Sequence, residues 1–309
     1  MFKYSNEELY PIEQFKLYKN LYRRIELIMH TNLLIALSNL ANNPLTDCAA
    51  LYKSTNRANG MGESLEFYIK DLFCGSTMYG DQQQKLEAYN HHFSYLGNQN
   101  NPPDIIIRGG DAIEVKKIES LNSGIALNSS YPKDKLYSNS PMITSECKNC
   151  ENWKEKDLLY IIGVTKNNTL KSLWFIYGDC YAANSEIYER VRKKISSGLQ
   201  ELSDVEFAET NELGRVNRVD PLGITYLRIR GMWHIENPNK VFDYITAIGE
   251  HDFTVNALVL TKKYNQFPEA DRKLIESTSA NGLSIADVRI KSPNNPANLL
   301  DAKLITMKR

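Results

Sequence analysis

The sequence predicts an α/β protein with a mixed central sheet flanked by helices and with extra elements at its C-terminal end. Two kinds of segment support this fold class. Stretches with apolar residues three and four positions apart indicate helices, as at 33–40 and 65–73. Short runs rich in β-branched and apolar residues indicate strands, at 105–107, 112–118, 157–165 and 170–177. With 309 residues, the chain is long enough to bury a full core.

Composition narrows the class of protein. Lys and Arg together number 37, as do Asp and Glu, so the formal net charge is zero. A protein that binds nucleic acid through bulk positive charge is normally more basic, so any such contact must come from local basic clusters. The charged start lacks an apolar signal segment, and no apolar run is long enough for a bilayer. The five cysteines show no disulfide spacing, so we expect a soluble cytoplasmic protein without a membrane partner.

We expect three parts in the chain. Residues 1–32 carry mixed charge and many tyrosines and predict a helical extension, with one helix at 13–29. Residues 33–248 hold the predicted strands and every candidate site residue, and form the main domain. Residues 249–309 predict a strand and a charged helix but contain no chemical motif. We therefore expect a C-terminal appendage whose role the sequence leaves open.

A helix is predicted around Glu66, because four apolar residues between 65 and 73 recur at helical spacing. Glu66 lies at the border of this apolar stripe, from which a carboxylate can reach inward to a metal. Glu63 is the second choice for that role. The alternative is an exposed ion pair of Glu66 with Lys70 at i,i+4 spacing, worth about 0.2–0.5 kcal/mol.

A hairpin at 105–118 carries the strongest chemical pattern. Two strand-like runs flank Arg108-Gly109-Gly110-Asp111, and a glycine pair there indicates a tight turn, since glycine reaches positive φ without a Cβ clash. Side chains alternate along a strand, so Glu114 and Lys116 share one face. Asp104 opens the first strand and would lie beside Glu114. Two carboxylates suit Mg²⁺, and the lysine ammonium beside them can help to activate a water molecule. The alternative is a surface hairpin with solvated charges.

The segment after this hairpin is small and polar. Asn128, Ser129, Ser130 and Lys133 are groups that donate to phosphate oxygens and base edges, so they are candidates for contact with nucleic acid. The same segment is also interpretable as a loop followed by a helix that begins at Pro132.

Further elements follow in order. Cys147 and Cys150 form a single CxxC, whereas a structural zinc site needs four ligands and no second pair follows at the usual spacing. Whether these two cysteines bind a metal is left open. Residues 166–168 predict a turn between two buried strands, and 182–197 predict an amphipathic helix that ends before Gly198.

A second basic concentration contains four arginines. Arg228 and Arg230 alternate with apolar residues, so a strand would present both on one face. Arg215 and Arg218 lie in a turn-rich stretch just upstream. Arginine is the usual bidentate partner of guanine O6 and N7 and also holds phosphates. The alternative is a solvated strand face with ion pairs.

Several of these segments resemble known nucleases. Pro103-Asp104 with Glu114-Val115-Lys116 resembles the signature of the PD-(D/E)xK superfamily, and Gly62 with Glu66 matches a helix found in many of its members. Over roughly Leu33 to Tyr244 the chain looks like the NgoPII family of type II restriction endonucleases. The stretches that carry this likeness are Arg57-Ala58-Asn59, Tyr95 to Asp104, Gly110 to Ser120, Ala126 to Lys133 and Glu212 to Tyr226.

The resemblance implies Mg²⁺-dependent cleavage of double-stranded DNA by a homodimer at a palindromic site, which is GGCC in that family. Asp104 and Glu114 would hold Mg²⁺, with the Ile113 backbone as a further oxygen ligand. Lys116 would orient or deprotonate the attacking water. Glu66 would complete a second metal position or hold a metal-bound water.

The resemblance also bears on partners and alternatives. A restriction enzyme works with a cognate DNA methyltransferase, and we expect this partnership to be functional rather than physical. The alternatives are a nuclease of DNA repair or recombination and an inactive relative that only binds DNA. Sequence-restricted double-strand cuts are expected of the restriction enzyme alone.

Overall fold

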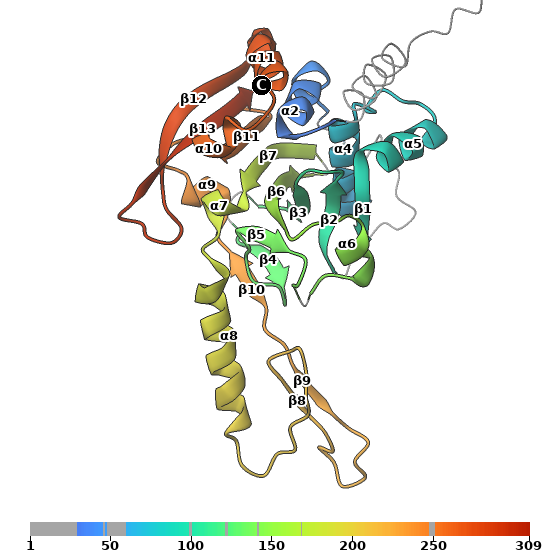
Figure 1. The fold of residues 1–309 in the computed structure, drawn as a ribbon, viewed down its shortest axis with the longest axis vertical. Helices are drawn as coiled ribbons and strands as arrows, with labels where there is room; N and C mark the ends of the chain where they lie inside the picture. The colour runs from blue at the N-terminus through green and yellow to red at the C-terminus, as the bar shows by residue number, and fades with distance from the viewer. Residues whose placement is uncertain are drawn as a thin grey trace, which may run out of the picture.

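The computed structural model describes residues 30–45, 47, 60–98, 101–120, 123–140, 142–167, 169–246 and 251–309. The helix predicted at 13–29 and the Arg57-Ala58-Asn59 stretch lie outside these residues. The described chain forms a body around one large sheet, from which an arm projects (Figure 1). The predicted fold class is confirmed, because the sheet is mixed and helices flank it.

Nine strands of the described chain form the central sheet. They are β1 (Phe93–Asn98), β2 (Asn101–Ile107), β3 (Ala112–Ile118), β5 (Lys135–Tyr137), β6 (Glu155–Lys166), β7 (Thr169–Tyr177), β11 (Thr254–Leu260), β12 (Leu283–Lys291) and β13 (Leu299–Lys308). Their order is β1-β2-β3-β6-β7-β11-β13-β12, with β5 paired to β6. Strands β3 and β6 run parallel, as do β7 and β11, and the other neighbours are antiparallel. The predicted glycine turn of the β2–β3 hairpin is confirmed, with Gly109 at φ +66°.

The helices of the body confirm the predicted helices at 33–40 and 65–73, and the charged helix predicted within residues 249–309 is present at 269–277. Asn32 caps the first of them, since its side-chain oxygen accepts the N–H groups of Leu34 and Ile35 at 2.9 and 3.2 Å. No helix in the described part of the chain is long and apolar enough to cross a membrane. The helices are α2 (Leu33–Asn42), α4 (Gly60–Cys74), α5 (Gln82–His92), α6 (Ser145–Asn149), α7 (Gly178–Tyr181), α9 (Pro238–Val241), α10 (Thr261–Tyr264), α11 (Glu269–Ser277) and the 3-10 helix η1 (Thr278–Asn281).

Helix α4 packs against the sheet through its predicted apolar stripe. Leu65, Ile69, Leu72 and Phe73 are each 0–1% exposed. A Cβ at Gly163 of β6 would lie 2.5 Å from Leu65 Cδ2, so the helix approaches the sheet at this glycine. Each fully buried side chain of this kind stabilises the fold by about 1.5–3 kcal/mol. The stripe therefore holds α4 firmly beside β3 and β6.

Residues 251–309 continue the central sheet. Strand β11 lies beside β7, with Thr254 opposite Ser172. Lys263 of α10 reaches back into the body, where its Nζ donates to Asp111 Oδ1 and Asp157 Oδ2 at 2.7 Å each. The division of the chain at residue 248 stays a prediction, but the sheet itself runs across that boundary.

The arm consists of α8 (Ser185–Gln200), β8 (Gly214–Val216) and β9 (Leu227–Ile229), and it joins the body beside β4 (Ile125–Asn128) and β10 (Trp233–Ile235). The predicted end of the helix before Gly198 is wrong, because α8 runs on to Gln200. Gly198 does not adopt the positive φ of a helix stop. It is one unfavourable residue inside the helix, at a cost of about 1 kcal/mol relative to alanine.

The alternative interpretation of a helix that begins at Pro132 is also wrong, since residues 135–137 form β5. Tyr160 fixes the backbone just before this strand, because its hydroxyl accepts the Lys133 N–H at 2.8 Å and donates to the Lys133 carbonyl at 3.2 Å. Leu136 is fully buried. Pairing with β6 thus outweighs the local tendency of a proline to begin a helix.

Candidate active site and nucleic-acid interface

The β2–β3 hairpin brings Asp104 and Glu114 together. Ile105 faces Ile113 in the antiparallel register, so the next step along the strands places Asp104 opposite Glu114. Asp104 is the fourth residue of β2 rather than its first, because the strand already begins at Asn101. Its Oδ2 accepts the Val115 N–H at 2.6 Å, which fixes the carboxyl group on this face of the sheet.

Lys116 lies next to this pair. Its Nζ donates to Glu114 Oε1 at 2.5 Å. The other carboxylate oxygen, Glu114 Oε2, is buried and has no hydrogen-bond partner in the described part of the chain. A buried carboxylate oxygen without a partner is costly and is therefore a natural ligand for a cation.

The electrostatics of the site disfavour the ionised form of Asp104. Burial raises the pKa of Asp104 from 3.8 to about 8, and the Glu114 carboxylate adds to the rise, while Lys116 and the Val115 N–H oppose it. Burial by itself lowers the pKa of Lys116, but the Glu114 and Asp104 carboxylates outweigh it and the pKa is raised. Lys116 is therefore a cation at neutral pH, whereas the negative charge of Asp104 is disfavoured, and a cation beside Asp104 would favour its ionised form.

These residues fit Mg²⁺, which is often bound by one or two carboxylates while waters fill its remaining positions. Within the described ranges, no three His, Cys, Asp or Glu side chains gather into a metal-binding group. Glu66 is thus not gathered with Asp104 and Glu114; it accepts a hydrogen bond from Lys70 at 2.6 Å, the i,i+4 pair that was its alternative. Its charge still contributes to the raised pKa values of Asp104 and Lys116.

Four other residues were candidates for a metal. Ile113 is fully buried between β2 and β6, and Glu63 is in the first turn of α4. Cys147 of α6 and Cys150 just after it are free thiols and form no metal-binding group with described residues. Burial of the Ile113 side chain does not test its backbone oxygen, whose ligand role stays a prediction. The carboxylate pair on the hairpin supplies an oxygen without a partner, at Glu114 Oε2.

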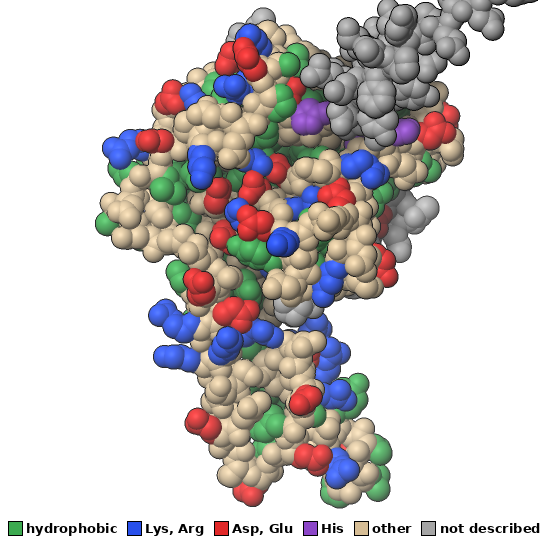
Figure 2. All heavy atoms as spheres, in the orientation of Figure 1, with side chains coloured by type: hydrophobic (Ala, Val, Ile, Leu, Met, Phe, Trp, Pro, Cys, Tyr) green, Lys and Arg blue, Asp and Glu red, His purple; other side chains and the backbone are tan. Residues whose placement is uncertain are grey.

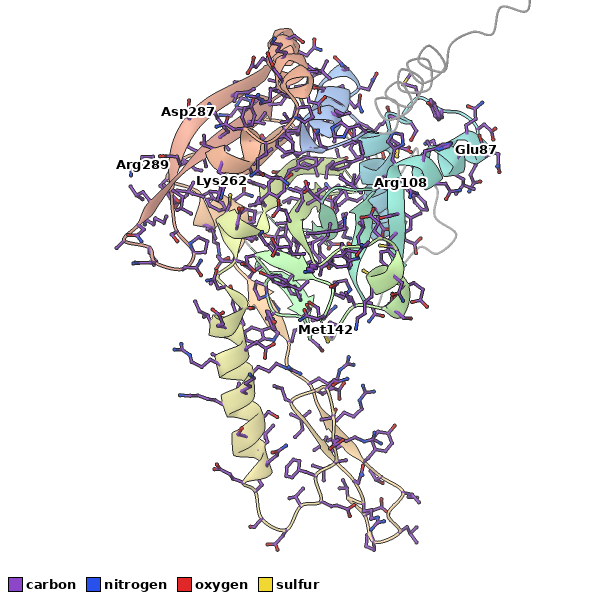
Figure 3. The ribbon with its side chains drawn as sticks, in the orientation of Figure 1. Glu87, Arg108, Met142, Lys262, Asp287 and Arg289 are labelled. Carbon is purple, nitrogen blue, oxygen red and sulfur yellow. The ribbon has the colours of Figure 1, made fainter. Side chains whose placement is uncertain are left out.

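A cavity of about 510 Å³ lies between the body and the arm. Met142, labelled in Figure 3, lines it from the lower edge of the body. On the face shown in Figure 2, Lys and Arg side chains gather around the junction of arm and body. Six of the eight residues predicted for DNA contact line this cavity, namely Ser129, Ser130, Lys133, Arg215, Arg228 and Arg230.

The other two predicted residues do not line it. Asn128 ends β4 at φ +52° and pairs with Trp233 of β10. Arg218 lies in the turn between β8 and β9 at φ +49°, and its Nη1 is 3.5 Å from Glu206. At both positions the backbone is in the left-handed conformation, which residues other than glycine seldom adopt. The local sequence did not reveal these two backbone conformations.

Glu212 organises two of the arginines. Arg228 donates to its two carboxylate oxygens at 2.9 and 2.6 Å, and Arg230 Nε lies 2.9 Å from Oε1. The predicted common face is confirmed, although β9 ends at Ile229 and Arg230 follows the strand. The ion pairs of the alternative interpretation are present as well.

Sequence reasoning missed three residues that shape the cavity. Glu212 and Tyr226 lie within one of the family-like stretches, which was the available signal. Arg192 of α8, which donates to the Asn211 carbonyl, carries no signal beyond its charge.

Lys133 lies between the cavity and the hairpin. Burial lowers its pKa to about 8, although the negative charges of Glu114 and Glu189 oppose the change. Its Nζ donates to the Ser130 hydroxyl and stands 4.9 Å from the centre of the Tyr131 ring. Its Nζ also donates to the Tyr131 carbonyl at 3.4 Å, and it forms no ion pair with a described residue, so one of its three N–H groups is left for an anion.

The mixed sheet with flanking helices is a restriction-endonuclease-like α/β fold. The family model described as NgoPII restriction endonuclease matches residues 31–291. The type II restriction enzyme NgoPII of Neisseria gonorrhoeae is 50% identical over 277 residues, which cover 89% of this chain and 99% of that protein. The chain belongs to the NgoPII restriction endonuclease family, as the resemblance predicted. No solved structure gives a significant match.

Proposed function

We propose that this family member makes Mg²⁺-dependent double-strand cuts in DNA at a short palindromic G·C-rich site, with GGCC suggested by the family resemblance. Type II restriction endonuclease activity follows from the family itself. The observation that supports the metal is the Glu114 oxygen without a partner, beside an Asp104 whose pKa is raised. A divalent cation would bind the free Glu114 oxygen and would offset the burial that disfavours the charge of Asp104.

The proposed roles divide among three residues. Asp104 and Glu114 would hold Mg²⁺, whose charge lowers the pKa of bound water and stabilises the phosphate in the transition state. Lys116 would donate hydrogen bonds to the attacking water or to a phosphate oxygen. Its raised pKa favours this orienting role over proton abstraction, because an ammonium has no lone pair to accept a proton. Ligand roles for Glu66 and the Ile113 backbone stay predictions.

We place the DNA against the body–arm junction. Lys133 lies there beside Ser129 and Ser130, and the arginines of the arm line the opposite side. Phosphate contacts from such groups fix the register of a duplex, and base contacts give specificity. A palindromic site has two-fold symmetry, so its reader is proposed to be a homodimer with one active site for each strand. A cognate methyltransferase is proposed as a functional partner only.

One experiment tests this function. Plasmid DNA is incubated with the protein and Mg²⁺, and the ends of the products are sequenced. We expect double-strand breaks at one short symmetric sequence, none in EDTA, and none with Asp104→Ala. Ends scattered over many sequences would indicate a repair or recombination nuclease, and DNA binding without breaks would indicate an inactive relative.

A further inference from the structure

Arg215 differs from the other arginines of the arm. Arg228 and Arg230 are bound to Glu212, and Arg218 lies near Glu206. The Arg215 guanidinium forms no ion pair with any residue in the described ranges, and its Nε is buried without a hydrogen-bond partner there. A guanidinium with unmet donors on the wall of a cavity is suited to a ligand with matching acceptors.

The side chain of Arg215 is also held in place. Its Cζ lies 4.9 Å from the centre of the Tyr226 ring, a cation–π contact that orients the planar group. Its backbone is fixed in β8, where Arg215 faces Arg228 of β9. Because a stacked guanidinium uses its face for the ring, its N–H edge stays available for a coplanar partner.

We propose that Arg215 is the residue that reads guanine, donating two hydrogen bonds to O6 and N7 of one guanine in the major groove. This inference rests on the proposed function and names the base contact within it. Guanine O6 and N7 are the pair of acceptors that match the fork of an arginine. A phosphate contact needs no such orientation, and Lys133, which also lines the cavity, is available for that role.

The test combines a protein change with a change in the base. The site is first read from the ends of the cut plasmid. Binding is then measured in Ca²⁺ or EDTA, so that cleavage does not interfere, on the native duplex and on duplexes with 7-deazaguanine at each guanine in turn. This analogue lacks the N7 acceptor and leaves the phosphates unchanged. The proteins are wild type, Arg215→Ala, Arg215→Lys and, as a matched control, Arg289→Ala on the exposed outer strand β12 (Figure 3).

We expect Arg215→Ala to weaken binding of the native duplex by about 5- to 150-fold, the discrimination of one bidentate pair. One 7-deazaguanine position should weaken wild type, and the same position should cause no further loss in Arg215→Ala. Arg215→Lys, which preserves charge, should retain part of the affinity but lose this sensitivity. Arg289→Ala should behave as wild type.

Three outcomes would overturn the proposal. The first is an undiminished 7-deazaguanine penalty in both Arg215 variants. The second is a loss in Arg215→Ala that is equal on all duplexes and disappears when one phosphate is replaced by a neutral methylphosphonate, which would make Arg215 a phosphate contact. The third is that Arg215→Ala binds the native duplex as tightly as the wild type does. Failure of the proposed function is distinguishable, since wild type would then cut no defined site.

Discussion

Replacing Asp104 with asparagine should stabilise the metal-free protein while abolishing DNA cleavage. The Asp104 carboxyl is buried beside Glu114, and its Oδ2 accepts the Val115 N–H at 2.6 Å. Asparagine has nearly the same shape and keeps an oxygen that can accept this hydrogen bond. It removes the negative charge, however, which the proposed metal requires and the metal-free fold disfavours.

The pKa of Asp104 sets the size and sign of the effect. Burial, with the charge of Glu114, raises this pKa from 3.8 to about 8. Below pH 3.8 the carboxyl is protonated in both the folded and the unfolded chain, so the wild type has its full stability. As the pH rises toward 8, the unfolded chain releases the proton first and the wild type loses stability relative to the variant.

This shift is about 4 pKa units, which at about 1.4 kcal/mol each gives an upper limit near 6 kcal/mol. Removing the charge also removes its attraction to Lys116. We therefore expect the variant to be more stable by about 2–4 kcal/mol at pH 8, and by less than half of that at pH 5.

Urea unfolding in EDTA, followed by tryptophan fluorescence at pH 5, 6.5 and 8, measures this difference. Asp301→Asn is a matched control, because Asp301 is 80% exposed and should give no comparable gain at any pH. A variant less stable than wild type at pH 8 would refute the reasoning. So would a gain of equal size at all three pH values.

Three further predictions concern cleavage, assembly and DNA contact. Cleavage in a gel assay should be abolished by each of Asp104→Ala, Glu114→Ala and Lys116→Ala. DNA binding should survive, because phosphate and base contacts remain. The control Lys117→Ala should reduce cleavage less, because the Lys117 side chain pairs with Glu119. Near wild-type rates in either carboxylate variant would contradict the metal assignment. Light scattering should show a homodimer on a duplex that contains the recognition site, and a monomer both free and bound to this duplex would contradict the expectation. Lys133→Ala should weaken binding of all sequences alike and reduce the slope of log K against log salt by about 1, so an unchanged slope would count against a phosphate contact.

The sequence by itself determined the local elements and the chemistry that they carry. The spacing of Leu65, Ile69 and Phe73 predicted α4, and the glycine pair at 109–110 predicted the hairpin that sets Asp104 against Glu114. These predictions succeeded because helical periodicity and tight turns depend on neighbours a few positions apart. The family resemblance likewise came from continuous stretches of residues, and the family match confirms it.

Only the tertiary structure decided how distant segments meet. It placed β11 beside β7, so that the last part of the chain joins the central sheet, and it closed one cavity from Ser129 on the body and Arg215 on the arm. It also paired Glu212 with Arg228 and Arg230 while leaving Arg215 on Tyr226. Such contacts depend on packing between residues far apart in sequence, and no local period or turn records which partner each charge will find.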